Sequence, residues 1–202
     1  MRETLSQARP GDVIAFAGKG LDAKIIQWFT LSPYSHVGIV LDTNSAETLQ
    51  EDILIAESTT YTTVPNFNQQ ECVEGVQVHW LSHWIDVYKD CGRAWLFPLQ
   101  EKPSPDRIAQ MQAWLWHLYR SQTPFSCRKS VTAWFPQNQY INEEKKKKLP
   151  PKESVGLFCS ELVTEALQIA GIIDPALNSA TQTPKDVMNL GCFGTPKLIL
   201  SG

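Results

Sequence analysis

The sequence lacks the features that mark several large classes of protein. It has no run of the roughly 18 apolar residues that span a membrane, and its opening, MRETLSQARP, contains no apolar core of a signal peptide. A formal net charge of -3 gives no general attraction to nucleic acid or anionic lipid, and no nucleic-acid readout motif is present. We therefore expect no transmembrane segment, no nucleic-acid partner and a cytoplasmic location for the chain as given.

Cysteine is too scarce and too irregularly spaced for a structural zinc site or a full disulfide framework. The count is odd, five, and no C-x-x-C pair occurs. The simplest interpretation is a reducing compartment with free thiols. We expect neither a metal nor another cofactor. The five cysteines are Cys72, Cys91, Cys127, Cys159 and Cys192.

The length and composition fit one globular domain. A chain of 202 residues, 43% of them hydrophobic, can bury a single core without disulfides or metal. The prediction is one domain over residues 1–202. A polar stretch at about 137–154, which includes four consecutive lysines and two prolines, is interpreted as a solvated insertion loop.

Short apolar runs bounded by turn residues predict strands early in the chain, and helical periodicity appears mainly later. The strands follow one another without long helical segments between them, which favours an antiparallel meander in an α+β fold. Strands are predicted at 13–16, 35–41, 53–58, 76–80, 94–97 and 197–200. Helices are predicted at 21–30, from Ser104 to about 121, at about 126–135, at 157–170 and from Thr183.

Cys159 is the first candidate for chemistry, because it falls in the opening turn of a predicted helix. The unpaired amides and the dipole at a helix N-terminus stabilise a thiolate, and the same amides can bind an oxyanion. A packing role is the alternative. Cys159 shares a helical face with Val163 and Ala166, and free cysteine is often buried as a small apolar residue.

His36 is the candidate base. It lies on a predicted strand beside apolar residues, with Gly38 on the same face leaving room for a second element to approach. A hydrogen-bonded core or surface histidine is the alternative. His79, His83 and His117 compete for the role, but none of them stands in so apolar a strand.

Glu57 is the candidate orienting acid. Strand alternation places it on the face of Ile53 and Ile55, where a carboxylate needs a partner. A histidine that must keep one tautomer and carry a proton is such a partner. The alternative is a glutamate at a strand end turned toward solvent.

Four segments in this order carry a family resemblance: 10–12 (Pro-Gly-Asp), 35–40 (Ser-His-Val-Gly-Ile-Val), 55–57 (Ile-Ala-Glu) and 158–162 (Phe-Cys-Ser-Glu-Leu). Together they resemble the YiiX/YebB-like group of circularly permuted, NlpC-type papain-like enzymes. The resemblance implies a small antiparallel sheet or barrel packed against helices. It also implies Cys159 as nucleophile, His36 as base and Glu57 as orienting acid, with Asp12 in a structural turn.

The activity implied is that of a cysteine hydrolase of amidase or peptidase type. It would form an acyl-enzyme on Cys159 and act on peptide, amide or lipid-acyl substrates, with cell-wall-type peptides suggested first. Transfer of the acyl group to an amine or lipid acceptor is an alternative that uses the same residues. An alternative of another class is a non-catalytic module that binds lipid or peptide while Cys159 only packs.

Overall fold

A computed structural model describes residues 2–18, 33–43, 53–68, 74–125 and 158–202. The helices predicted at 21–30 and 126–135 and the insertion predicted at 137–154 lie outside these residues. None of the helices formed by the described residues is both long enough and apolar enough to cross a membrane.

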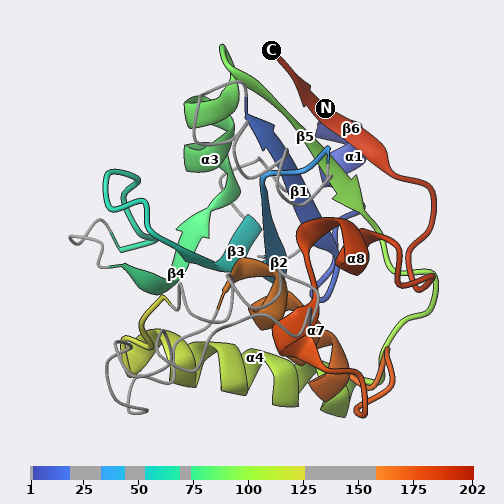
Figure 1. Cartoon of the computed structure of the whole chain (residues 1–202). Coiled ribbons are helices and arrows are strands. Elements are labelled where there is room, and N and C mark those ends of the chain that lie inside the picture. The colour runs from blue at the N-terminus through green and yellow to red at the C-terminus, as the bar shows by residue number, and fades with distance from the viewer. Residues whose placement is uncertain (1, 19–32, 44–52, 69–73, 126–157) are drawn as a thin grey trace, which may run out of the picture.

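The centre of the molecule is a six-stranded sheet in which every neighbouring pair is antiparallel (Figure 1). The strand order is β4-β3-β2-β1-β5-β6, so the first four strands form the predicted meander and β5 returns to the free side of β1. The described strands leave the sheet open, with β4 and β6 at its edges. The strands are β1 (Val13–Gly18), β2 (His36–Thr43), β3 (Ile53–Thr59), β4 (Gly75–Trp80), β5 (Gly92–Phe97) and β6 (Lys197–Ser201).

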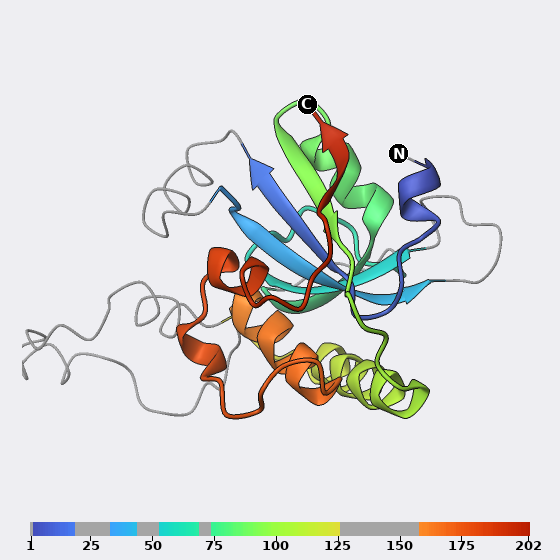
Figure 2. The ribbon, with the colours of Figure 1, turned by 90° about the vertical axis from the view of Figure 1, so that its right-hand side faces the viewer.

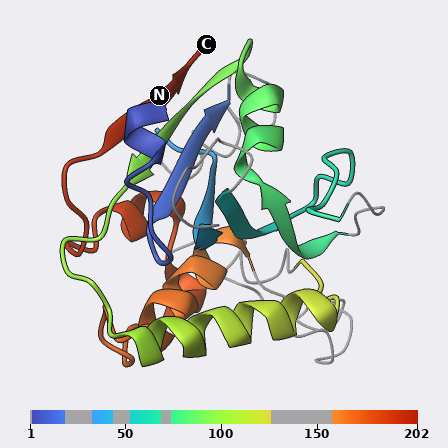
Figure 3. The same cartoon turned by 180° about the vertical axis from the view of Figure 1, so that it is seen from behind.

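Helices cover both faces of this sheet, and the mixed α+β class is confirmed. Figure 2 shows α3 on one side of the sheet and α4 with α7 on the other, and in Figure 3 α4 runs alongside α7. The helical segments are α1 (Arg2–Leu5), α3 (Leu81–Tyr88), α4 (Pro105–Arg120), α7 (Cys159–Ile169), the 3-10 turn η2 (Ser179–Thr181) and α8 (Pro184–Met188).

Strand alternation divides the buried side chains of β2 between two hydrophobic clusters. Val37, Ile39 and Leu41 belong to the cluster that includes residues of α4 and α7, whereas Val40 belongs to the cluster that includes residues of α3. Because both faces of the strand are buried, β2 is apolar along most of its length. The site described below lies on the α3 face.

The helix ends follow the signals in the sequence. Ser104 caps α4 by accepting the Arg107 N–H, and Thr183 caps α8 by accepting the Asp186 N–H. Gly171, at φ +71°, follows the end of α7 in the left-handed conformation that glycine adopts without strain.

Helix α3 was not predicted, although its apolar residues recur at helical spacing. Leu81, Trp84, Ile85 and Tyr88 are the buried residues of this helix. The helix starts directly after β4, and no side chain caps its N-terminus. The usual start signal is therefore absent, and only the periodicity could have revealed α3.

Asp12 is buried in the turn before β1 and holds two loops together. One carboxylate oxygen accepts the Arg9 N–H at 3.0 Å, and the other accepts the Leu99 N–H at 2.8 Å. Burial raises the pKa of Asp12, and these two backbone hydrogen bonds oppose the rise. The contacts fit the structural role expected for this residue.

Candidate active site

His36 is the first residue of β2 and projects toward α3. Its ring stacks with Phe16 at 6.0 Å between centroids and lies 5.6 Å from the Trp84 ring. Only 8% of the residue is exposed. Strand alternation and the cover provided by α3 therefore put the imidazole in an aromatic, nearly dry environment.

Glu57, on the neighbouring strand β3, contacts His36 directly. The two side chains approach to 2.5 Å between Nε2 of His36 and Oε2 of Glu57, and Glu57 is fully buried. The alternative of a solvent-facing glutamate is therefore wrong. Because a carboxylate oxygen accepts, Nε2 of His36 carries the hydrogen, and Nδ1 is the nitrogen left to face another group.

Gly38 does not leave the open space beside the imidazole that the sequence predicted, because β3 packs against it. A Cβ at position 38 would lie 3.3 Å from the Ala56 carbonyl oxygen and 3.5 Å from the Glu57 Cβ. The space beside the imidazole is therefore filled by β3, and the glycine allows the close approach of the β3 backbone at Ala56 rather than of the helix that carries the cysteine.

The second carboxylate oxygen of Glu57 has two neighbours that the sequence did not indicate. The indole N–H of Trp84 donates a hydrogen bond to Oε1. His79 of β4 lies with its Nε2 3.2 Å from the same oxygen. His79 is fully buried. The sequence favoured His36 over His79 as the candidate base because the strand of His36 is more apolar, and it did not indicate that His79 also contacts Glu57. The other two competitors, His83 and His117, make no contact with Glu57 among the described residues.

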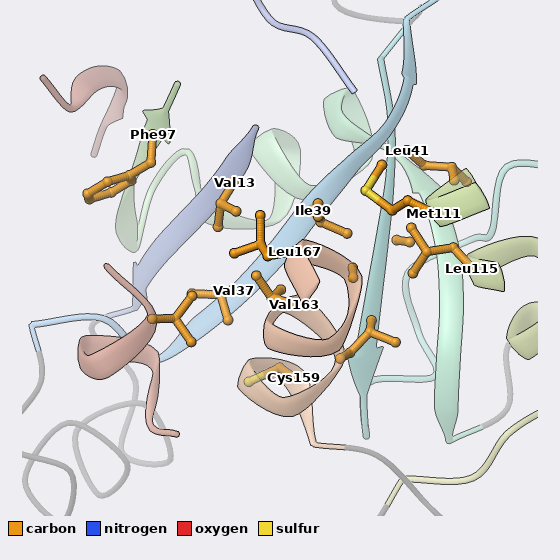
Figure 4. Close-up of a cluster of buried hydrophobic side chains, with 14 of the residues drawn as sticks. Val13, Val37, Ile39, Leu41, Phe97, Met111, Leu115, Cys159, Val163 and Leu167 are labelled. Atoms are coloured by element: carbon orange, nitrogen blue, oxygen red, sulfur yellow. The ribbon is translucent and has the colours of Figure 1, made fainter. Parts of the chain in front are cut away.

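Cys159 opens α7, as the sequence predicts. Phe158 before it is extended, and the Phe158 N–H donates to the Glu161 carboxylate at 3.4 Å, which is one half of a capping box. The first amides of the helix have no intrahelical acceptor, so they are available near the sulfur. In Figure 4, Cys159 lies in the first turn of α7, and Val163 and Leu167 follow it along the helix.

Cys159 and His36 meet at one small pocket, although most of the α7 face packs on the opposite side of the sheet. The pocket has a volume of about 60 Å³ and is lined by both residues. Its remaining walls are aromatic or hydroxyl-bearing: Ser35, Ser58, Thr59, Thr60, Tyr61, Tyr88, Phe125 and Phe158. The space is sufficient for a reacting group such as a carbonyl and too small for a whole drug-sized ligand.

Opposing effects set the charge of His36. Burial disfavours the charged ring and lowers its pKa, but the Glu57 carboxylate and the Cys159 side chain more than offset this and raise the pKa of His36 from 6.5 to about 10. At neutral pH the ring is therefore an imidazolium. Burial also raises the pKa of Tyr88 well above its usual value, so the hydroxyl that it contributes to the pocket stays protonated.

The described residues contain no group of three or more His, Cys, Asp or Glu side chains that could hold a metal ion. At the candidate site, the contacts of Glu57 explain why no ion could be held there. The 2.5 Å approach between His36 and Glu57 leaves no room for an ion between them, and the other oxygen of Glu57 accepts the Trp84 N–H.

The sequence matches no protein-family model, and a search of curated proteins finds no match. Among solved structures, the protein is similar to the metalloprotein YiiX from Escherichia coli O157:H7, with a TM-score of 0.52. The alignment covers 96% of this chain and 89% of that one at 16% sequence identity. The protein therefore has a YiiX-like fold.

Proposed function

We propose that this protein is a cysteine hydrolase of papain-like, permuted NlpC type, with Cys159 as nucleophile, His36 as its proton partner and Glu57 as the orienting acid. The observation that carries the proposal is that Cys159, at the start of α7, and His36 line the same pocket. Glu57 holds His36 there through the 2.5 Å contact between Oε2 and Nε2. A thiol, an imidazole and a carboxylate in this order form the triad of nucleophilic catalysis.

The chemistry starts from the charge of His36. In the resting pair the proton of Cys159 has passed to Nδ1 of His36, because the resulting imidazolium and the helix N-terminus both stabilise the thiolate. The sulfur then attacks an amide or ester carbonyl, and the backbone N–H groups at the start of α7 bind the oxyanion. As the intermediate collapses, the C–S bond remains, the bond to the leaving group breaks, and His36 gives its proton to that group. Water, deprotonated by His36, hydrolyses the acyl-enzyme in the second step.

Glu57 fixes which nitrogen of His36 takes part. Its carboxylate accepts the Nε2 hydrogen and leaves Nδ1 for the sulfur. The Trp84 N–H holds the carboxylate from the other side. The fully buried Glu57 therefore keeps one orientation through the cycle, which an exposed carboxylate would not.

The pocket favours a substrate with a small reacting group and an apolar neighbour. Its aromatic lining suits the acyl part of a peptide-type amide or a lipid ester, and peptide substrates remain our first expectation. Transfer of the acyl group to an amine or lipid uses the same residues. Mass spectrometry after incubation with acyl donors separates the two reactions, because a transferase keeps its Cys159 thioester until an acceptor is added.

The solved structure of YiiX is described as that of a metalloprotein. The described residues of this chain do not fit a metal ion, because no three of their side chains gather as ligands. The proposed steps accordingly use only the thiol, the imidazole, the carboxylate and the backbone amides.

The first test compares two thiols in one protein. Cys91 is exposed and serves as an internal reference, whereas only 1% of Cys159 is exposed. We expect iodoacetamide at pH 6 to label Cys159 faster than Cys91, measured by peptide mapping, because a thiolate reacts and an ordinary thiol does not. Labelling of Cys159 no faster than that of Cys91 would support the non-catalytic binding module instead.

The second test is turnover. Against a panel of peptide, amide and acyl-ester substrates, any hydrolysis found for the wild-type protein should disappear in Cys159→Ala and in His36→Ala. Cys91→Ala is the matched control and should retain the wild-type rate, because Cys91 is exposed and lines no part of the pocket. A detected activity that survives both site substitutions would eliminate the proposed pair.

A further inference from the structure

The described structure buries a second histidine against Glu57 that the proposed chemistry does not use. Neither His79 nor Glu57 is accessible to solvent, and Nε2 of His79 lies 3.2 Å from Oε1 of Glu57. That nitrogen has no hydrogen-bond partner among the described residues. The proximity is therefore that of two charges or dipoles rather than of a linear hydrogen bond.

The other nitrogen of His79 fixes where one hydrogen sits. Nδ1 lies 2.9 Å from the Pro65 carbonyl oxygen, and a carbonyl can only accept. Nδ1 therefore carries a hydrogen. If the ring were neutral, the unprotonated, electron-rich Nε2 would lie 3.2 Å from a carboxylate oxygen in a dry site, which is electrostatically unfavourable.

The balance of buried charges also indicates that His79 carries a hydrogen on each ring nitrogen. With Cys159 as thiolate and His36 as imidazolium, those two charges cancel and leave the negative charge of Glu57. No lysine or arginine of the described residues lies within ion-pair distance of Glu57. An uncompensated buried charge is strongly destabilising. A second hydrogen on His79 brings the buried group to neutrality.

We propose that His79 is a positioning residue that carries hydrogens on both ring nitrogens and, as the counter-charge of Glu57, holds the carboxylate in the orientation that His36 requires. This inference rests on the proposed function for the charge of Cys159. It assigns to β4 a part in the site, because the pairing of Ala56 with Val78 and of Ile55 with His79 brings this histidine beside β3.

Few groups face His79. Glu57 from β3 contacts Nε2, and the Trp84 ring of α3 lies 5.8 Å away, edge to face, and does not titrate. His83 of α3 reaches the same Pro65 carbonyl through its Nδ1, at 3.1 Å. His36 contacts the other carboxylate oxygen of Glu57, Oε2. Because His83 shares the carbonyl but does not contact Glu57, it provides a matched control.

The test is nuclear magnetic resonance of protein labelled with ¹⁵N at histidine. The chain has four histidines, so single substitutions assign every ring. We expect both ring nitrogens of His79 to give protonated shifts at pH 7 in the wild-type protein. An unprotonated Nε2 on His79 would overturn the proposal, and this measurement needs no variant to fold.

The second readout is the titration of His36. His79→Gln removes a positive charge that opposes protonation of His36 and partly neutralises Glu57, so the midpoint of His36 should rise by about one pH unit. His83→Gln should leave it unchanged. A purely structural role would lower the melting temperature without moving the His36 midpoint upward. A downward shift, or one no larger than in His83→Gln, would contradict the assignment.

These measurements separate the inference from the proposed function, because neither needs turnover. If Cys159 shows no enhanced reactivity while His79 is doubly protonated and His79→Gln raises the His36 midpoint, the hydrolase proposal fails and the role of His79 stands. The reverse pattern, a reactive Cys159 beside a singly protonated His79, would overturn the inference alone.

Discussion

Replacing Glu57 by glutamine tests whether the negative charge of Glu57 sets the pKa of His36. The substitution removes that charge by replacing one carboxylate oxygen with an NH2 group, at nearly constant shape. In the folded protein the pKa of His36 is about 10, against 6.5 for an ordinary histidine. A group whose pKa is raised by folding stabilises the folded state fully below its unfolded value. That stabilisation is lost as the pH rises toward the folded value, here between pH 6.5 and about 10.

The magnitude follows from the size of this window. One pKa unit corresponds to about 1.4 kcal/mol, so loss of the His36 proton taken alone would lower the free energy of unfolding by about 3 kcal/mol between pH 7 and pH 9. In the proposed pair Cys159 gives its proton to His36 and regains it on unfolding, so the observed fall should be smaller than this. In Glu57→Gln the amide carries no charge, so the largest of the effects that raise the pKa of His36 is removed. The variant should therefore lose much less stability than the wild-type protein over the same range.

The assay is denaturation by urea at pH 7, 8 and 9 for both proteins. The difference between them removes the contributions of groups that titrate in both. Glu165→Gln is the control for the same chemical change, because Glu165 lies on α7 and accepts a hydrogen bond from Ser179 away from this site. Parallel curves for wild-type protein and Glu57→Gln would refute the claim that Glu57 sets the charge of His36.

Two further predictions concern the backbone around the site. Gly38→Ala should destabilise the fold by about 1–3 kcal/mol in urea denaturation and slow the labelling of Cys159, since the added methyl would lie 3.3 Å from the Ala56 carbonyl oxygen and displace the strand that carries Glu57. Gly194→Ala, whose methyl would make only ordinary contacts, should do neither. Asp12→Asn should cost about 1–3 kcal/mol, because an amide cannot accept both backbone hydrogen bonds, but the rate of Cys159 labelling in the folded protein should stay unchanged. Equal labelling rates for Gly38→Ala and wild type, or slowed labelling in Asp12→Asn, would contradict these roles.

Local patterns in the sequence were sufficient for the strands and for most helix ends. Alternation placed His36 on the face of Gly38 and Glu57 on the face of Ile53 and Ile55, and the 2.5 Å contact shows that these are the same face of the sheet. The position of Cys159 at a helix start also followed from the chain itself. These features depend on a few neighbouring residues, which is why a single sequence reveals them.

The sequence by itself therefore determined the α+β class, the antiparallel meander and the face on which each candidate residue lies. Only the tertiary structure decided that His36 and Cys159 line one pocket, that the β3 backbone packs against Gly38, and that His79 and Trp84 contact the same carboxylate. The physical reason is that alternation gives the direction of a side chain relative to its own strand. What it meets there depends on the register of β4 against β3 and on how α3 folds over the sheet, and both involve contacts between distant parts of the chain.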